Sequence, residues 1–262
     1  MPLNVAIFQS DADESDVRHR VNKLDKALAN LPESTDLLVC PELFSSGYNM
    51  GGQLKQRAES KLGETAKHVA ELAKHFNTAI VYGYPEQEDE RIYNSALCID
   101  KHGETLINHR KLLFPPGFEA DHFDSGKSMS YFNIGAFKCC VLICYDAEFP
   151  ESIRAAALAG AHAVIIPTAL SENWGVVSEK VMPTRAFENG IWVIYANHSG
   201  TENGLRYYGG SCIVQPDGVD AARACAGEET IFAKISINAV EAAQARLPYL
   251  SQIQTLKALI SD

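Results

Sequence analysis

Apolar residues in the first third of the chain fall into short continuous runs, and stretches with a helical repeat separate these runs. The runs at residues 3–10, 35–42 and 78–86 have the length and composition of buried strands. Between them, residues 14–31 and 64–77 carry apolar side chains three and four positions apart, which is the spacing of an amphipathic helix. This alternation predicts a layered α/β fold.

The middle of the chain departs from the alternation and predicts consecutive strands. Residues 91–100 and 104–111 flank a Lys-His-Gly turn, and residues 131–135 and 137–144 meet around Gly135. Strands that follow one another through such short turns pair antiparallel. A mixed sheet, or a pair of sheets, is therefore expected.

Strands and helices alternate again in the second half of the chain. Helices and strands are predicted there at residues 148–160, 161–168, 177–190, 191–197 and 208–215. No internal repeat, low-complexity tract or linker interrupts the chain, so we predict one domain over residues 1–262. Its C-terminal segment, about residues 238–262, is helical in pattern and is expected to pack on the body or on a second copy.

Composition narrows the classes of function. The 262 residues are 46% hydrophobic, enough for a full core, and the net charge of −10 argues against a nucleic-acid partner, which needs a basic patch. The N-terminus lacks the basic and apolar regions of a signal peptide, and polar residues and a proline interrupt the longest uncharged stretch, residues 155–171. Seven cysteines, an odd number, favour free thiols in a reducing compartment. We expect a cytoplasmic protein, independent of membranes, that acts on a small molecule.

Three of the cysteines lie within residues 139–144. Cys144 stands where a predicted strand gives way to a predicted helix, so its side chain is exposed at the sheet edge and the backbone N–H groups after it can converge on one space. Cys139 and Cys140 lie within the strand, point to opposite faces and lack this setting. Spacing alone also allows all three to be core residues, so the assignment of Cys144 as a nucleophile depends on partners.

Two other predicted strand ends carry charged residues. Glu42 follows a buried run and a proline, Lys111 ends a strand, and Glu119 follows Lys111 in a proline-stiffened loop. Each alone is usually a solvated surface residue, although a carboxylate that follows a buried strand is costly unless it is paired or functional. Together with Cys144, an acid and a lysine at strand ends fit a site for acyl transfer.

The segments around these residues resemble the Glu, Lys and Cys signatures of the nitrilase superfamily, also called carbon–nitrogen hydrolases. They read PELFSSGY, HRKLLFP and CCVLICYDAEFPE, in the order and at the separations of the family. Further similar stretches lie at residues 161–169, 183–200 and 207–218, so the resemblance extends from residue 3 to about residue 250. It implies a four-layer αββα sandwich that pairs into a homodimer and needs no metal or organic cofactor.

The resemblance also implies roles for individual residues. Cys144 would attack the carbonyl carbon of an amide, Glu42 would act as general base, and Lys111 with the backbone N–H of Tyr145 would stabilise the oxyanion. Glu119 would orient the lysine or the substrate. The segments are most similar to those of amidases acting on small carboxamides, while nitriles, ω-amides and N-carbamoyl amides remain alternatives because those enzymes share the triad.

Several loop residues are expected near the active face. The candidates for lining the substrate pocket are Tyr48, Asn173, Trp174, Tyr195 and Asn197. Asp146 and Arg154 are expected to tie the cysteine elbow to its helix, because an acid at a helix start meets the helix dipole favourably.

Three rival hypotheses remain open on the sequence. A thiol-protease arrangement would pair Cys144 with His162 or His198 and orient the histidine through Asn197. A metal site would use Cys140 and Cys144, although no second ligand pair occurs at zinc-like spacing. A binding module that had lost the chemistry is disfavoured because all three catalytic residue types are present.

Overall fold

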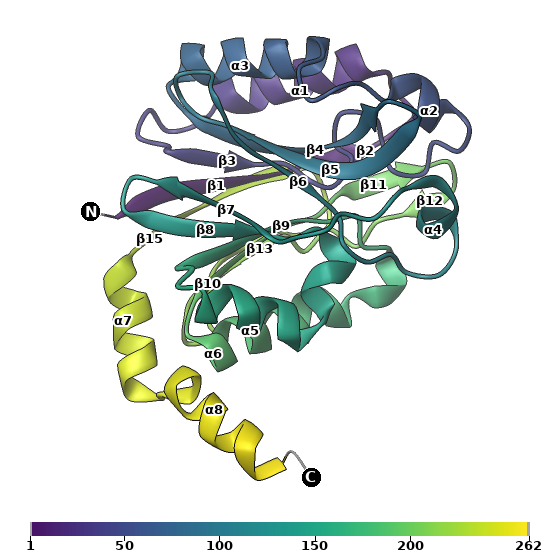
Figure 1. Cartoon of the computed structure of the whole chain (residues 1–262). Coiled ribbons are helices and arrows are strands. Elements are labelled where there is room, and N and C mark those ends of the chain that lie inside the picture. The colour runs from purple at the N-terminus through teal and green to yellow at the C-terminus, as the bar shows by residue number, and fades with distance from the viewer. Residues whose placement is uncertain (1, 261–262) are drawn as a thin grey trace.

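Two six-stranded sheets pack face to face, and helices cover the outer face of each sheet (Figure 1). The computed structural model describes residues 2–260. Its helix–sheet–sheet–helix order confirms the predicted four-layer αββα sandwich. Of the two arrangements expected, a mixed sheet or a pair of sheets, the structure has the pair, and each of its sheets is mixed.

The first sheet contains three parallel strands at its centre, which are β1, β3 and β4. The long antiparallel pair β5 and β6 extends it on one side and β15 on the other. In spatial order its strands are β15 (Glu229–Ile235), β1 (Leu3–Gln9), β3 (Leu37–Val39), β4 (Ala79–Glu88), β5 (Arg91–Ile99) and β6 (Thr105–Arg110).

The second sheet repeats this plan, with β8, β9 and β10 parallel and antiparallel strands outside them. In spatial order its strands are β14 (Asp220–Arg223), β13 (Cys212–Val214), β10 (Trp192–Ala196), β9 (Ala163–Pro167), β8 (Phe137–Val141) and β7 (Ser130–Ile134). A small third sheet joins β12 (Leu205–Arg206), β11 (Ser199–Glu202) and β2 (Asp11–Ala12).

Two helices cover each sheet. On the first sheet these are α1 (Val17–Ala29) and α3 (Glu64–Phe76), and on the second α5 (Pro150–Leu158) and α6 (Met182–Asn189). The Asp16 side chain caps α1 by accepting the backbone N–H of His19 at 2.8 Å. The short helices are α2 (Gln53–Arg57), α4 (Phe118–His122), the 3₁₀ turns η1 (Cys144–Glu148) and η2 (Glu172–Trp174), and the π turn η3 (Val177–Val181).

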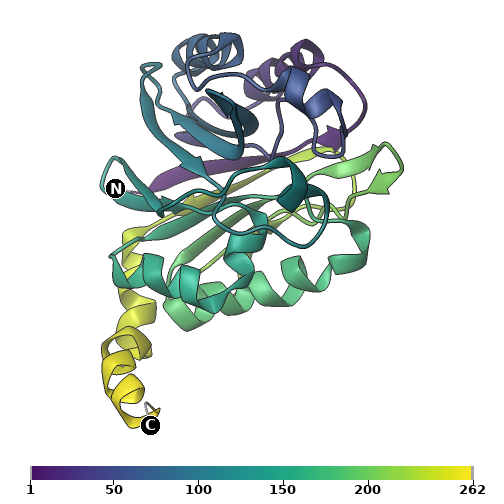
Figure 2. The ribbon, with the colours of Figure 1, turned by 45° about the vertical axis from the view of Figure 1, so that its right-hand side comes forward.

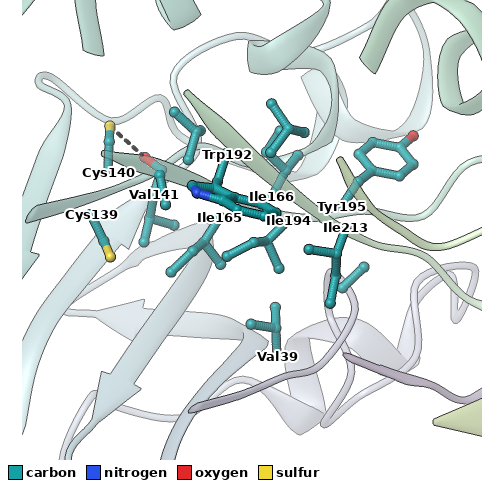
Figure 3. Close-up of a cluster of buried hydrophobic side chains, with 14 of the residues drawn as sticks. Val39, Cys139, Cys140, Val141, Ile165, Ile166, Trp192, Ile194, Tyr195 and Ile213 are labelled. Carbon is teal, nitrogen blue, oxygen red and sulfur yellow. Dashed lines mark hydrogen bonds between the residues drawn. The ribbon is translucent and has the colours of Figure 1, made fainter. Parts of the chain in front are cut away.

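The main hydrophobic core lies between the two sheets. Figure 3 shows Val39 of the first sheet pointing toward Ile165 and Ile194 of the second. Cys139 and Cys140 are fully buried and point to opposite faces of the second sheet, as expected for neighbours inside a strand (Figure 3). A second apolar cluster packs α1 and α3 onto the outer face of the first sheet.

The C-terminal part differs from the sequence prediction in two ways. Strands β14 and β15 were not predicted, and β15 pairs antiparallel with β1 over its whole length. The predicted single helix divides at Leu247 and Pro248 into α7 (Ile237–Arg246) and α8 (Tyr249–Ile260), because a proline cannot continue a helix ladder. Helix α8 extends away from the sheets in both views (Figures 1 and 2).

No helix within residues 2–260 is long and apolar enough to cross a membrane.

Candidate active site

Three strand ends deliver the predicted reactive residues to one side of the sandwich. Glu42 follows β3 and Lys111 follows β6, both in the first sheet, whereas Cys144 follows β8 in the second. The backbone N–H of Lys111 donates to the carbonyl of Asn94 on β5 at 2.8 Å, which extends the sheet ladder as far as the lysine. The site therefore forms where the two sheets meet.

A buried ion cluster occupies the floor of this site. Lys111 Nζ lies 2.7 Å from Glu42 Oε1 and 2.7 and 2.6 Å from the two carboxylate oxygens of Glu119. Asn94 Nδ2 donates to Glu42 Oε1 at 2.6 Å and to Glu119 Oε2 at 3.1 Å. All four side chains are buried, so these charge-assisted bonds hold the lysine and both carboxylates in one geometry.

Cys144 has a backbone conformation that is uncommon for a residue with a side chain. It begins η1 with φ of +46°, in the left-handed region. Such conformations are costly and cluster at functional sites. Unlike Cys139 and Cys140, Cys144 is partly exposed, and the strand-to-helix elbow predicted from the sequence is present.

Burial and neighbouring charges set the protonation of the site. Burial raises the pKa of Glu42 to about 7; Lys111 opposes the rise and Glu119 adds to it. Burial and the carboxylates of Glu42 and Glu119 also hold the pKa of the Cys144 thiol well above its usual range, against the pull of Lys111. Burial lowers the pKa of Lys111, but the surrounding anionic groups raise it more. The resting site therefore has a neutral thiol and a charged lysine, and the thiol needs a base.

The two carboxylate oxygens of Glu42 differ in their hydrogen bonding. Glu42 Oε1 accepts from Lys111 and Asn94, whereas Oε2 is buried and has no hydrogen-bond partner among residues 2–260. A buried carboxylate oxygen without a donor is unusual in a folded protein. It leaves one oxygen available to accept a proton.

Asp146 joins the lysine strand end to the cysteine elbow. Its carboxylate accepts the backbone N–H groups of Leu113 at 2.8 Å and of Leu112 and Ile143 at 3.2 Å. Asp146 thus contacts the start of η1 as expected, since Ile143 immediately precedes that turn, and the bonds to Leu112 and Leu113 add a link to the other sheet. Arg154 donates to a backbone carbonyl of α6 at 2.7 Å and so joins α5 to α6.

A cleft of about 560 Å³ opens above the cluster. Its apolar walls include Pro116, Phe118, Leu170, Trp174 and Leu205. Its polar and reactive groups include Tyr48, Glu119, Cys144, Tyr145 and Glu148. The cleft is thus largely apolar with a few convergent polar groups, as small-molecule sites usually are.

Of the five residues expected to line the pocket, Tyr48 and Trp174 lie on the cleft wall, and Tyr48 OH donates to Glu119 Oε1 at 2.8 Å. The other three are not among the cleft-lining side chains. Asn173 is exposed and Tyr195 is fully buried within β10. The Asn197 side chain is also buried and bonds the backbone of neighbouring loops, so its contacts are structural.

The histidines of the thiol-protease hypothesis are engaged elsewhere. His198 Nε2 lies 2.7 Å from the backbone carbonyl of Glu42, and burial lowers the pKa of His198 to about 3, so the ring is neutral and donates this bond. His162 Nδ1 accepts the backbone N–H of Lys138 at 3.0 Å. Neither ring contacts Cys144 in a hydrogen bond. Within the described chain, no group of three or more His, Cys, Asp or Glu side chains is arranged to hold a metal ion.

Two supporting residues were missed in the sequence. Asn94 bridges both carboxylates of the ion cluster, and Glu202 anchors the loop that carries Tyr48. Glu202 Oε2 accepts the backbone N–H of Tyr48 at 2.9 Å, and its Oε1 pairs with buried Arg20 at 2.8 Å. Nothing in the local sequence distinguishes either residue, because the partners named above, Glu42, Glu119, Tyr48 and Arg20, lie 25 to 182 positions away.

The chain is similar to several known proteins. Residues 4–245 match the family model of carbon-nitrogen hydrolases. A hydrolase encoded in the pqqF 5′ region of Pseudomonas protegens is 36% identical, over 95% of this chain and 88% of its own length. An (R)-stereoselective amidase from Pseudomonas sp. is 29% identical, over 95% of this chain and 90% of its own. The structure of an amidase variant from Nesterenkonia sp. AN1 in complex with butyramide superimposes with a TM-score of 0.84 at 30% identity, covering 94% of this chain and 95% of the other.

Proposed function

The chain belongs to the carbon–nitrogen hydrolase family, and from this premise we propose that it is an amidase that hydrolyses the C–N bond of a small carboxamide to a carboxylic acid and ammonia. The observation that carries the proposal is the buried Glu42–Lys111–Glu119 cluster beneath the partly exposed elbow of Cys144. The butyramide bound to the Nesterenkonia amidase variant supports a simple carboxamide as the substrate class.

The first half of the reaction forms a thioester. Glu42 Oε2 takes the proton of the Cys144 thiol, and the sulfur attacks the carbonyl carbon of the amide. The developing oxyanion receives hydrogen bonds from Lys111 Nζ and the backbone N–H of Tyr145; loss of one such donor costs about 3 kcal/mol. Glu42 then returns its proton to the nitrogen as the C–N bond breaks, and ammonia leaves.

The second half hydrolyses the thioester. Water loses a proton to Glu42 and attacks the acyl carbon, and the oxyanion again meets Lys111 and Tyr145. Collapse of this intermediate breaks the C–S bond, releases the carboxylic acid and returns the proton to Cys144. A pKa near 7 suits Glu42 for this double role, because a group that must both accept and donate a proton works best when its pKa is close to the working pH.

An acyl-enzyme test addresses the proposal directly. During turnover of butyramide, intact-mass analysis should detect protein whose mass has increased by that of the butyryl group minus the thiol hydrogen that it replaces. Ammonia should be released at the same time. The Cys144→Ser variant is the control and should show neither at the wild-type level. Hydrolysis of nitriles, ω-amides or N-carbamoyl amides without hydrolysis of simple amides would contradict the assignment in favour of one of those alternatives.

We also propose that the protein works in the cytoplasm as a homodimer. The free cysteines, six of them at least partly buried, support a reducing compartment. Helix α8 supports pairing, because Leu259 and Ile260 are 74% and 70% exposed on a helix that stands away from the sheets. Light scattering should give twice the 28.7 kDa chain mass, and a monomer at micromolar concentration would contradict the dimer.

A further inference from the structure

One acidic side chain in the cleft has no part in the proposed reaction. Glu148 is the last residue of η1, four positions after Cys144, and it is half-buried in the cleft wall. Arg185 Nη2 donates to its backbone carbonyl at 2.6 Å and so fixes the residue in place. Its carboxylate accepts no hydrogen bond from the described residues and is available to a ligand.

The charged side chains that line the cleft are two carboxylates, Glu119 and Glu148. No lysine or arginine is among the cleft-lining side chains. Lys111 lies below the cleft, where two carboxylates already surround it. Arg185 lies behind Glu148 and is paired with Glu188 at 3.2 Å. Lys111 and Arg185 lie near enough to attract an ionised Glu148, but neither forms a salt bridge with it, so its carboxylate is left to pair with a cation in the cleft.

Burial raises the pKa of the Glu148 carboxyl, and Lys111 and Arg185 oppose the rise. The ionised form of a carboxylate that is costly to ionise in the empty cleft is stabilised when a cationic partner binds beside it. A second carboxylate brought into the cleft by a substrate would be repelled instead.

The spacing sets where such a partner would lie. A 3₁₀ helix rises about 2 Å per residue, so the Cα atoms of Cys144 and Glu148 are about 8 Å apart. A substrate whose carbonyl carbon is at Cys144 could thus extend three or four methylene groups toward Glu148. Apolar walls formed by Phe118, Leu170 and Leu205 suit that hydrocarbon segment.

We propose that Glu148 is a specificity-determining residue that selects amides carrying a positively charged amine a few bonds from the amide carbon. This inference rests on the proposed amidase function and names its substrate class. Cationic amides of the aminoalkanamide type are favoured, neutral aliphatic amides are accepted, and amides that end in a carboxylate are disfavoured.

The test uses three amides of similar length and different charge: 4-aminobutanamide, pentanamide and succinamate. For the wild-type enzyme, kcat/KM for 4-aminobutanamide should exceed that for succinamate by at least tenfold. In Glu148→Gln, the ratio of cationic to neutral kcat/KM should fall about tenfold, equivalent to about 1.4 kcal/mol, and the ratio of anionic to neutral should rise. Glu151→Gln is the matched control, because it removes the same charge from an exposed position on α5 outside the cleft.

The outcomes separate the two proposals. If pentanamide is hydrolysed and both ratios are the same in wild type and Glu148→Gln, the specificity role is refuted and the amidase function stands. Equal shifts in Glu148→Gln and Glu151→Gln would also refute it, because they would reflect net charge alone. If the wild type hydrolyses none of the three amides and forms no adduct on Cys144, the amidase function itself fails, and this inference fails with it.

Discussion

Replacing Glu42 by glutamine should stabilise the fold while it stops the reaction. The side chain is fully buried, and burial raises its pKa from an ordinary value of 4.5 to about 7. Because one pH unit corresponds to about 1.4 kcal/mol, ionising Glu42 in the folded protein costs about 3 kcal/mol more than in the unfolded chain. Glutamine has the same shape and is not ionised at any working pH, so it avoids this cost.

The sign of the effect depends on pH. Between pH 4.5 and 7 the folded protein binds more protons at Glu42 than the unfolded chain does. The free energy of unfolding of the wild type therefore falls as the pH rises through this window. Glu42→Gln lacks that loss, so its advantage in stability should be near zero at pH 4.5 and grow to about 3 kcal/mol above pH 7.

Urea unfolding of both proteins at pH 5 and pH 8, followed by tryptophan fluorescence at equal protein concentration, measures this difference. The other titrating groups are common to both proteins, so their contributions to the pH dependence of the unfolding free energy largely cancel in the difference. The Glu151→Gln variant is the control, because it shows how the loss of an exposed carboxylate changes stability. Activity should fall at least a hundredfold, the usual contribution of a general base. In the wild type, kcat/KM should fall as the pH drops below about 7, when the base becomes protonated.

A stability difference that is the same at both pH values would refute the argument, because Glu42 would then titrate alike in the folded and unfolded chains. Destabilisation of Glu42→Gln at pH 8 would show that the ion pair with Lys111 outweighs the cost of burying the carboxylate. Activity near the wild-type level would remove Glu42 as the base.

Two further substitutions test the supports of the site. Gly83→Ala should lower stability by about 1–3 kcal/mol and displace Glu42, since a Cβ would lie 2.7 Å from the Glu42 Cα; Gly227→Ala, which has open space, is the control, and equal melting temperatures for the two variants would contradict the clash. Asp146→Asn should weaken the bonds that hold the loop after Lys111, which are worth about 1.5–3 kcal/mol to a charged acceptor. At a temperature well below the melting temperature of the variant, where it is fully folded, Asp146→Asn should still have a lower kcat/KM than the wild type. An unchanged kcat/KM would exclude a positioning role.

The sequence predicts the central strands well because both of their faces are buried. Residues 163–167 are apolar throughout, and residues 3–9 are apolar except for Asn4 and Gln9, so both segments stand out as apolar runs. Strand β15 alternates buried and exposed positions at a sheet edge, and neither a run nor a clear turn distinguishes it from the surrounding loops. Its place beside β1 depends on pairing with residues that lie at least 220 positions away in the sequence.

The candidate site divides in the same way. Glu42, Lys111 and Cys144 are predictable because each stands at the end of a recognisable strand, within a segment that resembles a family signature. Asn94 lies in the middle of β5, and Asp146 accepts backbone N–H groups, which every residue except proline possesses. Such contacts depend on the tertiary fold and have no signature in the residue pattern.

The position of the site between the sheets explains why it needs these supports. Glu42 and Lys111 belong to the first sheet and Cys144 to the second, so the distance between base and nucleophile depends on how the sheets pack. Apolar side chains in the core between them attract without direction and leave room for small shifts. Hydrogen bonds restrict such shifts: Asp146 binds the loop after Lys111, and His198, which follows the second sheet's β10, binds the Glu42 carbonyl. Directional bonds between the two sheets thus fix the position of one sheet relative to the other at the cleft, which hydrophobic packing alone does not specify.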